Sequence, residues 1–375
     1  MKKILCTVIA FISLQTTVFS ETPALEINSK SAILTEHSTG EVLYEMNADE
    51  QLPIASVTKI MTMLLIVEAL DSGSIALDDF VPISERAMSM GGSTMFLEVG
   101  EQVTVDEMLK GIAVASANDG TVAMAEYISG SESEFIRKMN TRAKELGMKN
   151  TSFINTNGLD ADGHYSSARD VAIMSAELLK HDIIFNYTTI WTDTMRGGKY
   201  ELANTNKLIR FYEGANGLKT GSTDEALCCL SASAKRDNMQ LIAVVLGAPN
   251  SNERFGGART LLDYGFSAYA INEILPADTV LGKTTVKCGT SKEINVSVRE
   301  SEKLLVPKSN MPEISYDIKF MENIKAPVYK GDTVGECSVI KDGTVIKKVP
   351  VYASETVEKK SFIASFRETV GIVIS

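Results

Sequence analysis

The stretch ASVTKIMTMLLIVEAL, residues 55–70, places a lysine at the head of an almost unbroken apolar run. A helix on a protein surface keeps its charged residues on one face, and this stretch does not. Apolar residues recur at helical spacing at Ile60, Met63, Leu64 and Val67, and most of the positions between them are apolar too. The pattern therefore predicts a helix that is buried on all sides, in the centre of a helical region.

Composition limits the class of protein. The chain has 375 residues, of which 44% are hydrophobic and 23% are charged, and this fits a soluble globular protein with two domains. The formal net charge of -11 argues against nucleic-acid binding through phosphates. With three histidines and no metal-ligand spacing, we expect neither a metal nor any other cofactor.

The two ends of the chain predict where the protein acts. Residues 1–20 carry two lysines, a short apolar core and a small final residue, which is the pattern of a secretory signal peptide. Residues 356–375 predict an amphipathic helix on a membrane surface, with Phe362, Phe366 and Val373 on one face. The alternatives for this tail are a terminal helix packed on its own domain and a frayed end.

Four cysteines remain after the signal peptide. Cys228 and Cys229 are adjacent in a predicted strand, so their side chains would point to opposite faces and would not pair. Cys288 and Cys337 could form a disulfide, and the sequence leaves that question open.

Residues 21–275 predict one α+β domain with an antiparallel sheet. The expected elements are a hairpin over 31–47 with its turn at 38–40, helical segments over 56–180, two strands over 218–248 with a turn at 235–238, and a helix over 256–275. Thr104 with Glu107, and Ser167 with Asp170, predict helix N-termini by their capping patterns.

Residues 276–355 predict a small all-β domain that begins at the break marked by Pro276. The expected strands cover 284–288, 293–299, 303–307, 313–320 and 338–353, the last with a hairpin turn at Asp342-Gly343.

The pair Ser56 and Lys59 forms an S-x-x-K pattern at the start of the buried helix. Residues three apart at this place share a face, and burial lowers the pKa of a lysine by disfavouring its charged form. A neutral lysine beside a serine hydroxyl is a base beside a nucleophile. The alternative is that Ser56 caps the helix and Lys59 reaches solvent. A second S-x-x-K, Ser338 to Lys341, lies in a predicted strand, where residues three apart face opposite sides.

Two further motifs follow in the chain. S-x-N at Ser116–Asn118 lies between two predicted helices, and K-T-G at Lys219–Gly221 opens a predicted strand. Each motif alone could be structural, the first as a polar turn and the second as a turn glycine beside a surface lysine. Three such motifs in this order, on helix, loop and strand, favour a catalytic site.

With these motifs the sequence resembles the serine penicillin-recognising enzymes. More closely it resembles low-molecular-mass penicillin-binding proteins that are serine-type D-alanyl-D-alanine carboxypeptidases. The resemblance rests on PIASVTKIMT, SANDG, GLDADGHYSSARD, GANGLKTGSTDEA and LLDYGF, and it extends over nearly the whole mature chain. It implies a β-lactamase/transpeptidase-like catalytic domain, a small all-β domain and a C-terminal amphipathic helix.

The resemblance also implies catalytic roles. Ser56 would attack the carbonyl of the penultimate D-alanine of a peptidoglycan stem peptide, and Lys59 would take its proton. Ser116 would relay a proton to the leaving amine. β-Lactams would acylate Ser56 as covalent inhibitors.

Substrate binding would fall to six residues: Asn118, Lys219, Thr220, Gly221, Ser222 and Arg254. Asn118 would hold the substrate backbone, and Lys219 with Thr220 would bind the terminal carboxylate. Gly221 would let the substrate pass close to the strand. The backbone N–H groups of Ser56 and Ser222 would form the oxyanion hole. Arg254 would add a second cation near the carboxylate, unless it is a solvated surface arginine.

Two rival functions have different expectations. A class A β-lactamase needs an E-x-x-L-N loop before K-T-G, and residues 118–219 contain none; GLDADGHY, with Asp160 and Asp162, resembles the carboxypeptidase version of that loop. A non-catalytic envelope protein that binds murein would have no need for an intact Ser56, Lys59 and Lys219.

Overall fold

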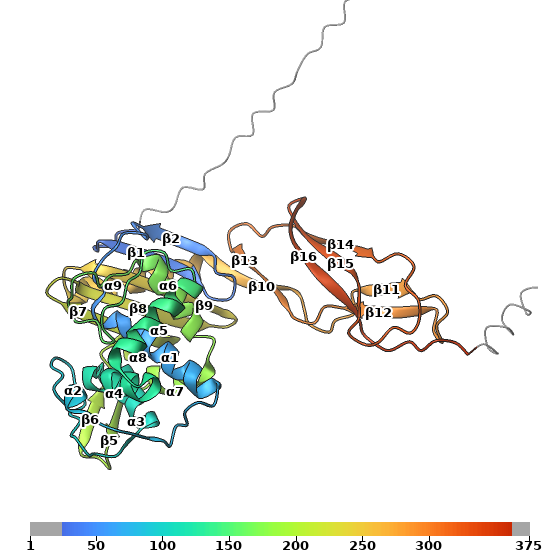
Figure 1. The fold of residues 1–375 in the computed structure, drawn as a ribbon. Coiled ribbons are helices and arrows are strands. Elements are labelled where there is room, and N and C mark those ends of the chain that lie inside the picture. Colours follow the sequence, from blue (N-terminus) through green and yellow to red (C-terminus); the bar gives the residue numbers. More distant parts are fainter. Residues whose placement is uncertain (1–24, 362–375) are drawn as a thin grey trace, which may run out of the picture.

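The computed structural model describes residues 25–361. An α+β part, which begins at the N-terminal end, is followed by an elongated all-β part, and a narrow two-stranded ribbon lies between them (Figure 1). This is the fold class that the sequence predicted.

A five-stranded antiparallel sheet is the framework of the α+β part, with the strand order β2-β1-β9-β8-β7. Its strands are β1 (Ser31–Glu36), β2 (Val42–Met46), β7 (Ala215–Thr223), β8 (Leu227–Arg236) and β9 (Met239–Ala248). The first hairpin and its turn are confirmed. Since β7 is an edge strand, one of its sides remains open to a substrate.

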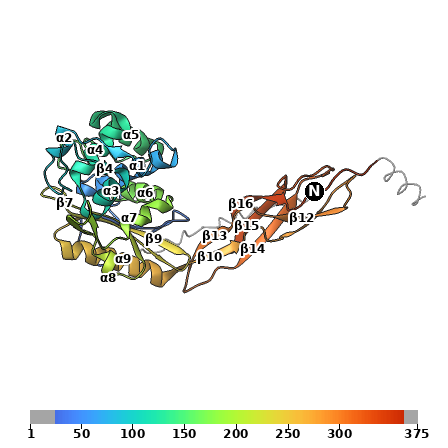
Figure 2. The ribbon, with the colours of Figure 1, turned by 90° about the horizontal axis from the view of Figure 1, so that it is seen from below.

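The sheet is covered on both faces. Every residue of β9 is buried: Ile242 and Val244 pack into the helical core, whereas Ala243 and Val245 pack on the opposite side against α9 (Ser251–Ala268). Figure 2 shows α9 on one side of the sheet and α1, α4 and α5 on the other. Such two-sided burial makes the strand apolar along its whole length.

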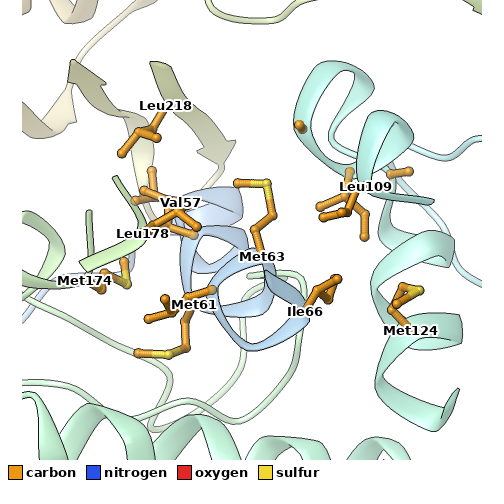
Figure 3. Close-up of a cluster of buried hydrophobic side chains, with 14 of the residues drawn as sticks. Val57, Met61, Met63, Ile66, Leu109, Met124, Met174, Leu178 and Leu218 are labelled. Atoms are coloured by element: carbon orange, nitrogen blue, oxygen red, sulfur yellow. The ribbon is translucent and has the colours of Figure 1, made fainter. Parts of the chain in front are cut away.

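The helical region surrounds α1 (Lys59–Asp71), as its apolar sequence predicted. Met61, Met63 and Ile66 point in different directions from α1, and each is in contact with buried side chains of neighbouring elements (Figure 3). The other helices of this region are α2 (Glu85–Met88), α3 (Val105–Lys110), α4 (Asn118–Ser129), α5 (Glu132–Glu145), α6 (Ala168–Leu178) and α7 (Phe185–Thr188). The short helix α8 (Leu208–Phe211) lies apart from them, with Leu208 in the core on the α9 side of the sheet. Two short ribbons complete this region: β3 (Phe80–Val81) with β4 (Val103–Thr104), and β5 (Thr192–Met195) with β6 (Tyr200–Ala203).

Both predicted N-caps are present. At the start of α3, the Thr104 side chain accepts from the Glu107 N–H and the Glu107 carboxylate accepts from the Thr104 N–H, which completes a capping box. At the start of α6, the Ser167 hydroxyl accepts from the Asp170 N–H.

The prediction of two strands over 218–248 is wrong, because this region contains β7, β8 and β9. The turn at 235–238 is real, with Asp237 at a φ of 51°. A second turn over 224–226 divides the first predicted strand, and K-T-G lies within β7 instead of opening it. The strand begins at Ala215, since Ala215 and Gly217 pair with Ala234 and Ser233 of β8. The register shifts at Asn216 between them, whose Oδ1 accepts from the Ser233 hydroxyl.

The predicted helix over 256–275 ends early. α9 stops at Ala268, and β10 (Tyr269–Leu275) follows directly. β10 pairs with β13 (Glu302–Pro307), a partner about 30 residues away in the chain, so its strand state depends on a contact that local sequence does not reveal. These two strands form the ribbon between the two parts.

The all-β part contains a sheet with the order β11-β12-β16-β15-β14. Its strands are β11 (Gly282–Thr285), β12 (Glu293–Ser297), β14 (Ile314–Phe320), β15 (Thr333–Lys341) and β16 (Thr344–Ala353). Asp342 and Gly343 have positive φ at the predicted hairpin turn. Cys288 is exposed, Cys337 is buried in the core, and both are free thiols, which answers the open question about their pairing.

The segment 356–361 is extended, so the predicted helix cannot begin at residue 356. Val357 is buried and bridges to Val328, while Lys359 bridges to Gly289. The rest of the predicted tail helix, with Phe362, Phe366, Val370 and Val373, lies outside the described residues, as does the predicted signal peptide. Within residues 25–361, no helix has the length and apolar character that a membrane crossing requires.

Candidate active site

Ser56 and Lys59 lie where a 3-10 turn, η1 (Ala55–Thr58), runs into α1. Ser56 is partly exposed, whereas Lys59 is completely buried. Edge strand β7 passes close to this turn at Gly221: a Cβ there would lie 2.8 Å from both Ile54 O and Ser56 N. The glycine therefore lets β7 approach the nucleophile turn, a reason that the sequence alone did not provide.

The Lys59 amine has three close neighbours. Its Nζ lies 2.8 Å from Ser56 Oγ, 2.7 Å from Asn118 Oδ1 and 2.7 Å from the backbone oxygen of Asn157. The last two atoms can only accept hydrogen bonds. If they take the two N–H groups of a neutral amine, its lone pair remains for the hydroxyl proton of Ser56. The same three oxygens could also accept from the three N–H groups of an ammonium, so the contacts permit a neutral lysine and the electrostatics decide its protonation state.

The electrostatics favour the neutral form of Lys59. Burial lowers the pKa of Lys59 well below its usual value, and the positive charge of Lys219 lowers it further. The carboxylate of Asp119 opposes this shift to a smaller extent. The alternative in which Lys59 reaches solvent is therefore wrong.

The S-x-N residues follow a π-helical turn, η2 (Gly111–Ala115), at its junction with α4. Ser116 is buried and adopts a left-handed conformation, with φ at 64°. The side chain of Asn118 has two contacts, since its Oδ1 accepts from Lys59 and its Nδ2 donates to Gly91 O at 2.7 Å. Asn118 thus positions the lysine directly.

The K-T-G residues lie on β7, where Gly221 passes close to Ser56. Lys219 is buried, and its Nζ donates to Thr220 O at 3.0 Å. Thr220 Oγ1 donates to Thr205 Oγ1 at 2.7 Å. Burial and the nearby charge of Arg254 lower the pKa of Lys219 to about 7. Ser222, the next residue, is exposed.

Arg254 is not a surface arginine. Its residue is only 8% exposed, and Nη1 donates to Gly221 O at 3.1 Å and to Cys229 O at 3.5 Å. The side chain therefore extends from α9 to the carbonyls of β7 and β8. Its positive charge lowers the pKa of Lys219, and its hydrogen bond to Gly221 O holds β7, the strand that carries K-T-G.

The loop 153–166 forms another wall of the site. His164 accepts from the Ile154 N–H through Nδ1, so the proton is on Nε2, which donates to Thr58 Oγ1 at 2.8 Å. Burial lowers the pKa of His164 to about 4, so the ring is neutral at pH 7. Gly158 has a φ of 87°, and a Cβ there would lie 1.8 Å from Ala55 O. Both contacts fix the loop against the nucleophile turn.

The sequence reasoning missed the contribution of Asn157 and Asp119. Asn157 reaches Lys59 through a backbone oxygen, and no residue type signals that role. Asp119, next to S-x-N, accepts from the N–H groups of Met95 and Leu97 and so holds the segment beside Asn118. Its position directly after the motif was the only signal. In the part of the chain that the structure describes, no three His, Cys, Asp or Glu side chains form a group that could hold a metal.

A partly exposed serine beside a buried lysine of lowered pKa, with a second buried lysine on the adjacent strand, is the arrangement expected of a serine enzyme that acts by acyl transfer. The sequence profile of the D-alanyl-D-alanine carboxypeptidase family matches residues 17–250. The profile of the penicillin-binding protein 5 C-terminal domain matches residues 269–359. The first profile covers the α+β part up to the start of α9, and the second covers the ribbon and the all-β part.

Individual relatives agree with this. The chain is 50% identical to the D-alanyl-D-alanine carboxypeptidase DacF of Bacillus subtilis over 354 residues, which are 93% of this chain and 91% of the relative. It is 34% identical to DacC of Escherichia coli over 90% of this chain and 86% of the relative. The crystal structure of penicillin-binding protein 5 from Haemophilus influenzae matches with a TM-score of 0.77 and 31% identity, covering 90% of this chain and 99% of that one.

The chain belongs to the D-alanyl-D-alanine carboxypeptidase family. It is a serine-type D-Ala-D-Ala carboxypeptidase and a low-molecular-mass penicillin-binding protein, with a transpeptidase-like catalytic domain and a β-rich second domain.

Proposed function

We propose that Ser56 is the nucleophile and Lys59 its general base, in removal of the terminal D-alanine from peptidoglycan stem pentapeptides. The observation that carries this is the complete burial of Lys59 with its Nζ 2.8 Å from Ser56 Oγ, because burial favours the neutral amine. Ser56 Oγ attacks the carbonyl carbon of the penultimate D-alanine as its proton moves to Lys59. The peptide C–N bond then breaks, and an ester on Ser56 remains for water to hydrolyse.

The leaving amine needs a proton. Ser116, buried beside Asn118, passes the proton from Lys59 to the nitrogen of the departing D-alanine. Asn118 supports both steps, because it holds Lys59 through Oδ1 while the second lone pair of that oxygen accepts from the substrate N–H.

The terminal carboxylate binds at the K-T-G end of β7. Lys219 supplies the positive charge, Thr220 supplies a hydroxyl, and buried Arg254 adds to the positive potential behind the strand. The oxyanion is held by the N–H groups of Ser56 and Ser222, each worth about 3 kcal/mol in serine enzymes. The close approach of Gly221 to Ser56 N supports this arrangement, because it brings these two backbone segments together.

Penicillins imitate this substrate, since the lactam carbonyl stands for the peptide carbonyl and the carboxylate for the terminus. The penicillin-binding protein D2 of Listeria monocytogenes, which is 32% identical over 65% of this chain with a TM-score of 0.60, has been solved with ampicillin bound. We expect the same class of inhibitor to acylate Ser56.

The rival functions fit less well. A class A β-lactamase uses a carboxylate to activate its deacylating water, whereas the residue of this loop that contacts Lys59 is Asn157, through its backbone carbonyl. Asp160, an acid of the same loop, accepts from Thr223. A non-catalytic murein-binding protein would not need a completely buried Lys59 at 2.8 Å from Ser56.

The location is also a proposal. Residues 1–20 direct export, residues 21–275 and 276–355 form the catalytic and all-β domains, and the tail after Ser361 holds the protein on the outer face of the cytoplasmic membrane. The apolar stripe of the tail and its Arg367, together with Lys359 and Lys360 directly before it, suit anionic lipid.

The test is the mass of the protein after incubation with penicillin. We expect one penicillin per chain, on the peptide that contains Ser56, and no adduct on a Ser56→Ala variant. Ser338→Ala, which alters the serine of the second S-x-x-K, is the matched control and should label normally. An adduct that survives Ser56→Ala would remove Ser56 from the mechanism.

A further inference from the structure

The direction of the substrate along β7 follows from the proposed function, on which this inference rests. The terminal carboxylate lies at Lys219 and Thr220, and the scissile carbonyl lies at Gly221 and Ser222. An extended peptide advances by about 3.3 Å per residue, as a strand does. The residue that precedes the two D-alanines therefore lies beside Thr223, where β7 ends.

Asp160, which belongs to the loop 153–166, is held beside Thr223. Thr223 Oγ1 donates to Asp160 Oδ1 at 2.6 Å. This hydrogen bond occupies one carboxylate oxygen and leaves the other for a ligand.

The loop that carries Asp160 is attached to the catalytic residues. Asn155 Oδ1 accepts from the N–H groups of Asn157 and Gly158, the carbonyl of Asn157 accepts from Lys59, and Gly158 contacts Ala55. The position of Asp160 is therefore set relative to the scissile bond, and not by a free surface loop.

The surroundings match a side chain that is apolar along its length and positive at its end. Leu159, next to Asp160 in the chain, is 40% exposed and offers an apolar contact. Residues 157–163 and 222–226, which meet at the Asp160–Thr223 hydrogen bond, contain four acidic residues and no lysine, arginine or histidine. A methylene chain can lie on Leu159 while its terminal amine reaches the carboxylate.

We propose that Asp160 is a specificity-determining residue, which binds the free side-chain amine of a diamino acid directly before D-Ala-D-Ala. The enzyme then distinguishes stem peptides in which this amine is free from those in which it is acylated, as it is at a cross-link. Uncross-linked stems with a free amine are the preferred substrates.

The test compares two peptides with the full chain: Nα-acetyl-L-Lys-D-Ala-D-Ala, whose ε-amine is free, and the Nα,Nε-diacetyl form. We expect kcat/KM to be about fivefold higher for the free amine, mainly through KM, since exposed ion pairs are of this strength. The preference should shrink as salt is added.

Asp160→Asn keeps an acceptor for Thr223 but removes the charge, so the ratio of the two kcat/KM values should fall to about one. Asp162→Asn, which removes the same charge two residues along the loop, is the control and should keep the ratio. Penicillin lacks the side-chain amine, so normal labelling of Asp160→Asn shows that the variant is folded.

Three results would overturn the proposal: no preference in the wild type, an equal loss on both peptides in Asp160→Asn, or the same fall of the ratio in Asp162→Asn. The last result would mean that the preference comes from the combined negative charge of residues 157–163 and 222–226, and not from Asp160 itself. Cleavage of the diacetylated peptide by the wild type separates this test from that of the reaction itself, which needs no side-chain amine.

Discussion

The chain contains two S-x-x-K stretches, and their structures differ completely. Ser56 and Lys59 lie at the start of a helix, with Nζ and Oγ 2.8 Å apart in a buried cleft. Ser338 and Lys341 lie on β15, where Ser338 pairs with Lys348 across the sheet and Lys341 pairs with Thr344 at the hairpin end. Residues three apart in a strand face opposite sides, so this second pair cannot act together.

The comparison teaches that the four-residue pattern carries no chemistry by itself. In the proposed mechanism the first pair acts together because the helix puts both side chains on one face, burial lowers the pKa of the lysine, and two carbonyl oxygens orient its amine. The second pair has the same letters in a different element, and it serves as an internal control for the experiments below.

The largest expected effect separates the two lysines directly. Lys59→Arg should lower the rate of acylation by penicillin about a thousandfold, because arginine keeps the charge but cannot become a neutral base. Lys341→Arg should acylate at the wild-type rate. Near-normal acylation by Lys59→Arg would mean that Lys59 is a simple cation, and the contrast between the two stretches would then have no catalytic meaning.

The next largest effect distinguishes the role of Lys219 from that of Lys59, the other buried lysine of the site. Lys219→Ala should lower kcat/KM about 30-fold or more for peptides with a free terminal carboxylate, because a desolvated charge loses its partner. The same peptides amidated at the terminus should lose much less. A similar loss on both kinds of peptide would assign Lys219 a structural role in β7.

The pH dependence should reveal both lysines at once. Burial and the charge of Lys219 lower the pKa of Lys59, so kcat/KM should rise with pH as the base forms. It should then fall about tenfold per pH unit above a pH of about 7, as Lys219 loses its charge. Lys219→Arg should move this fall to higher pH, and the amidated peptide should not exhibit it. A fall that is unchanged in Lys219→Arg would belong to another group.

The smallest expected effect on catalysis concerns the C-terminal tail, which follows the all-β domain that contains the second S-x-x-K. A variant that ends at Ser361 keeps the bridges of Val357 and Lys359 to the all-β domain, so it should fold and cleave soluble peptide at the full-length rate. It should fail to float with anionic liposomes, which the full-length protein should do. Flotation of the truncated protein would place the membrane contact elsewhere.

Much of this protein could be predicted from local sequence. The buried helix, the first hairpin, both N-caps and most strands of the all-β domain depend on residue periodicity and turn chemistry, which act over a few residues. The three motifs indicated the proposed catalytic residues because each is a short pattern on one element. The errors fall where the state of a segment depends on distant partners: β10 is a strand because β13 pairs with it, and residues 356–361 are extended because Val357 is buried against Val328.

Only the tertiary structure decided what the motif residues do. It brought Asn118 and the Asn157 carbonyl, 59 and 98 positions from Lys59 in the chain, to the same amine, and it replaced the surface position considered for Arg254 with a buried one behind β7. It also placed Asp160 on Thr223 across the cleft. The sequence determined which groups are present, because side-chain chemistry is local. The fold determined their protonation and their partners, because burial and distance are properties of the packed chain.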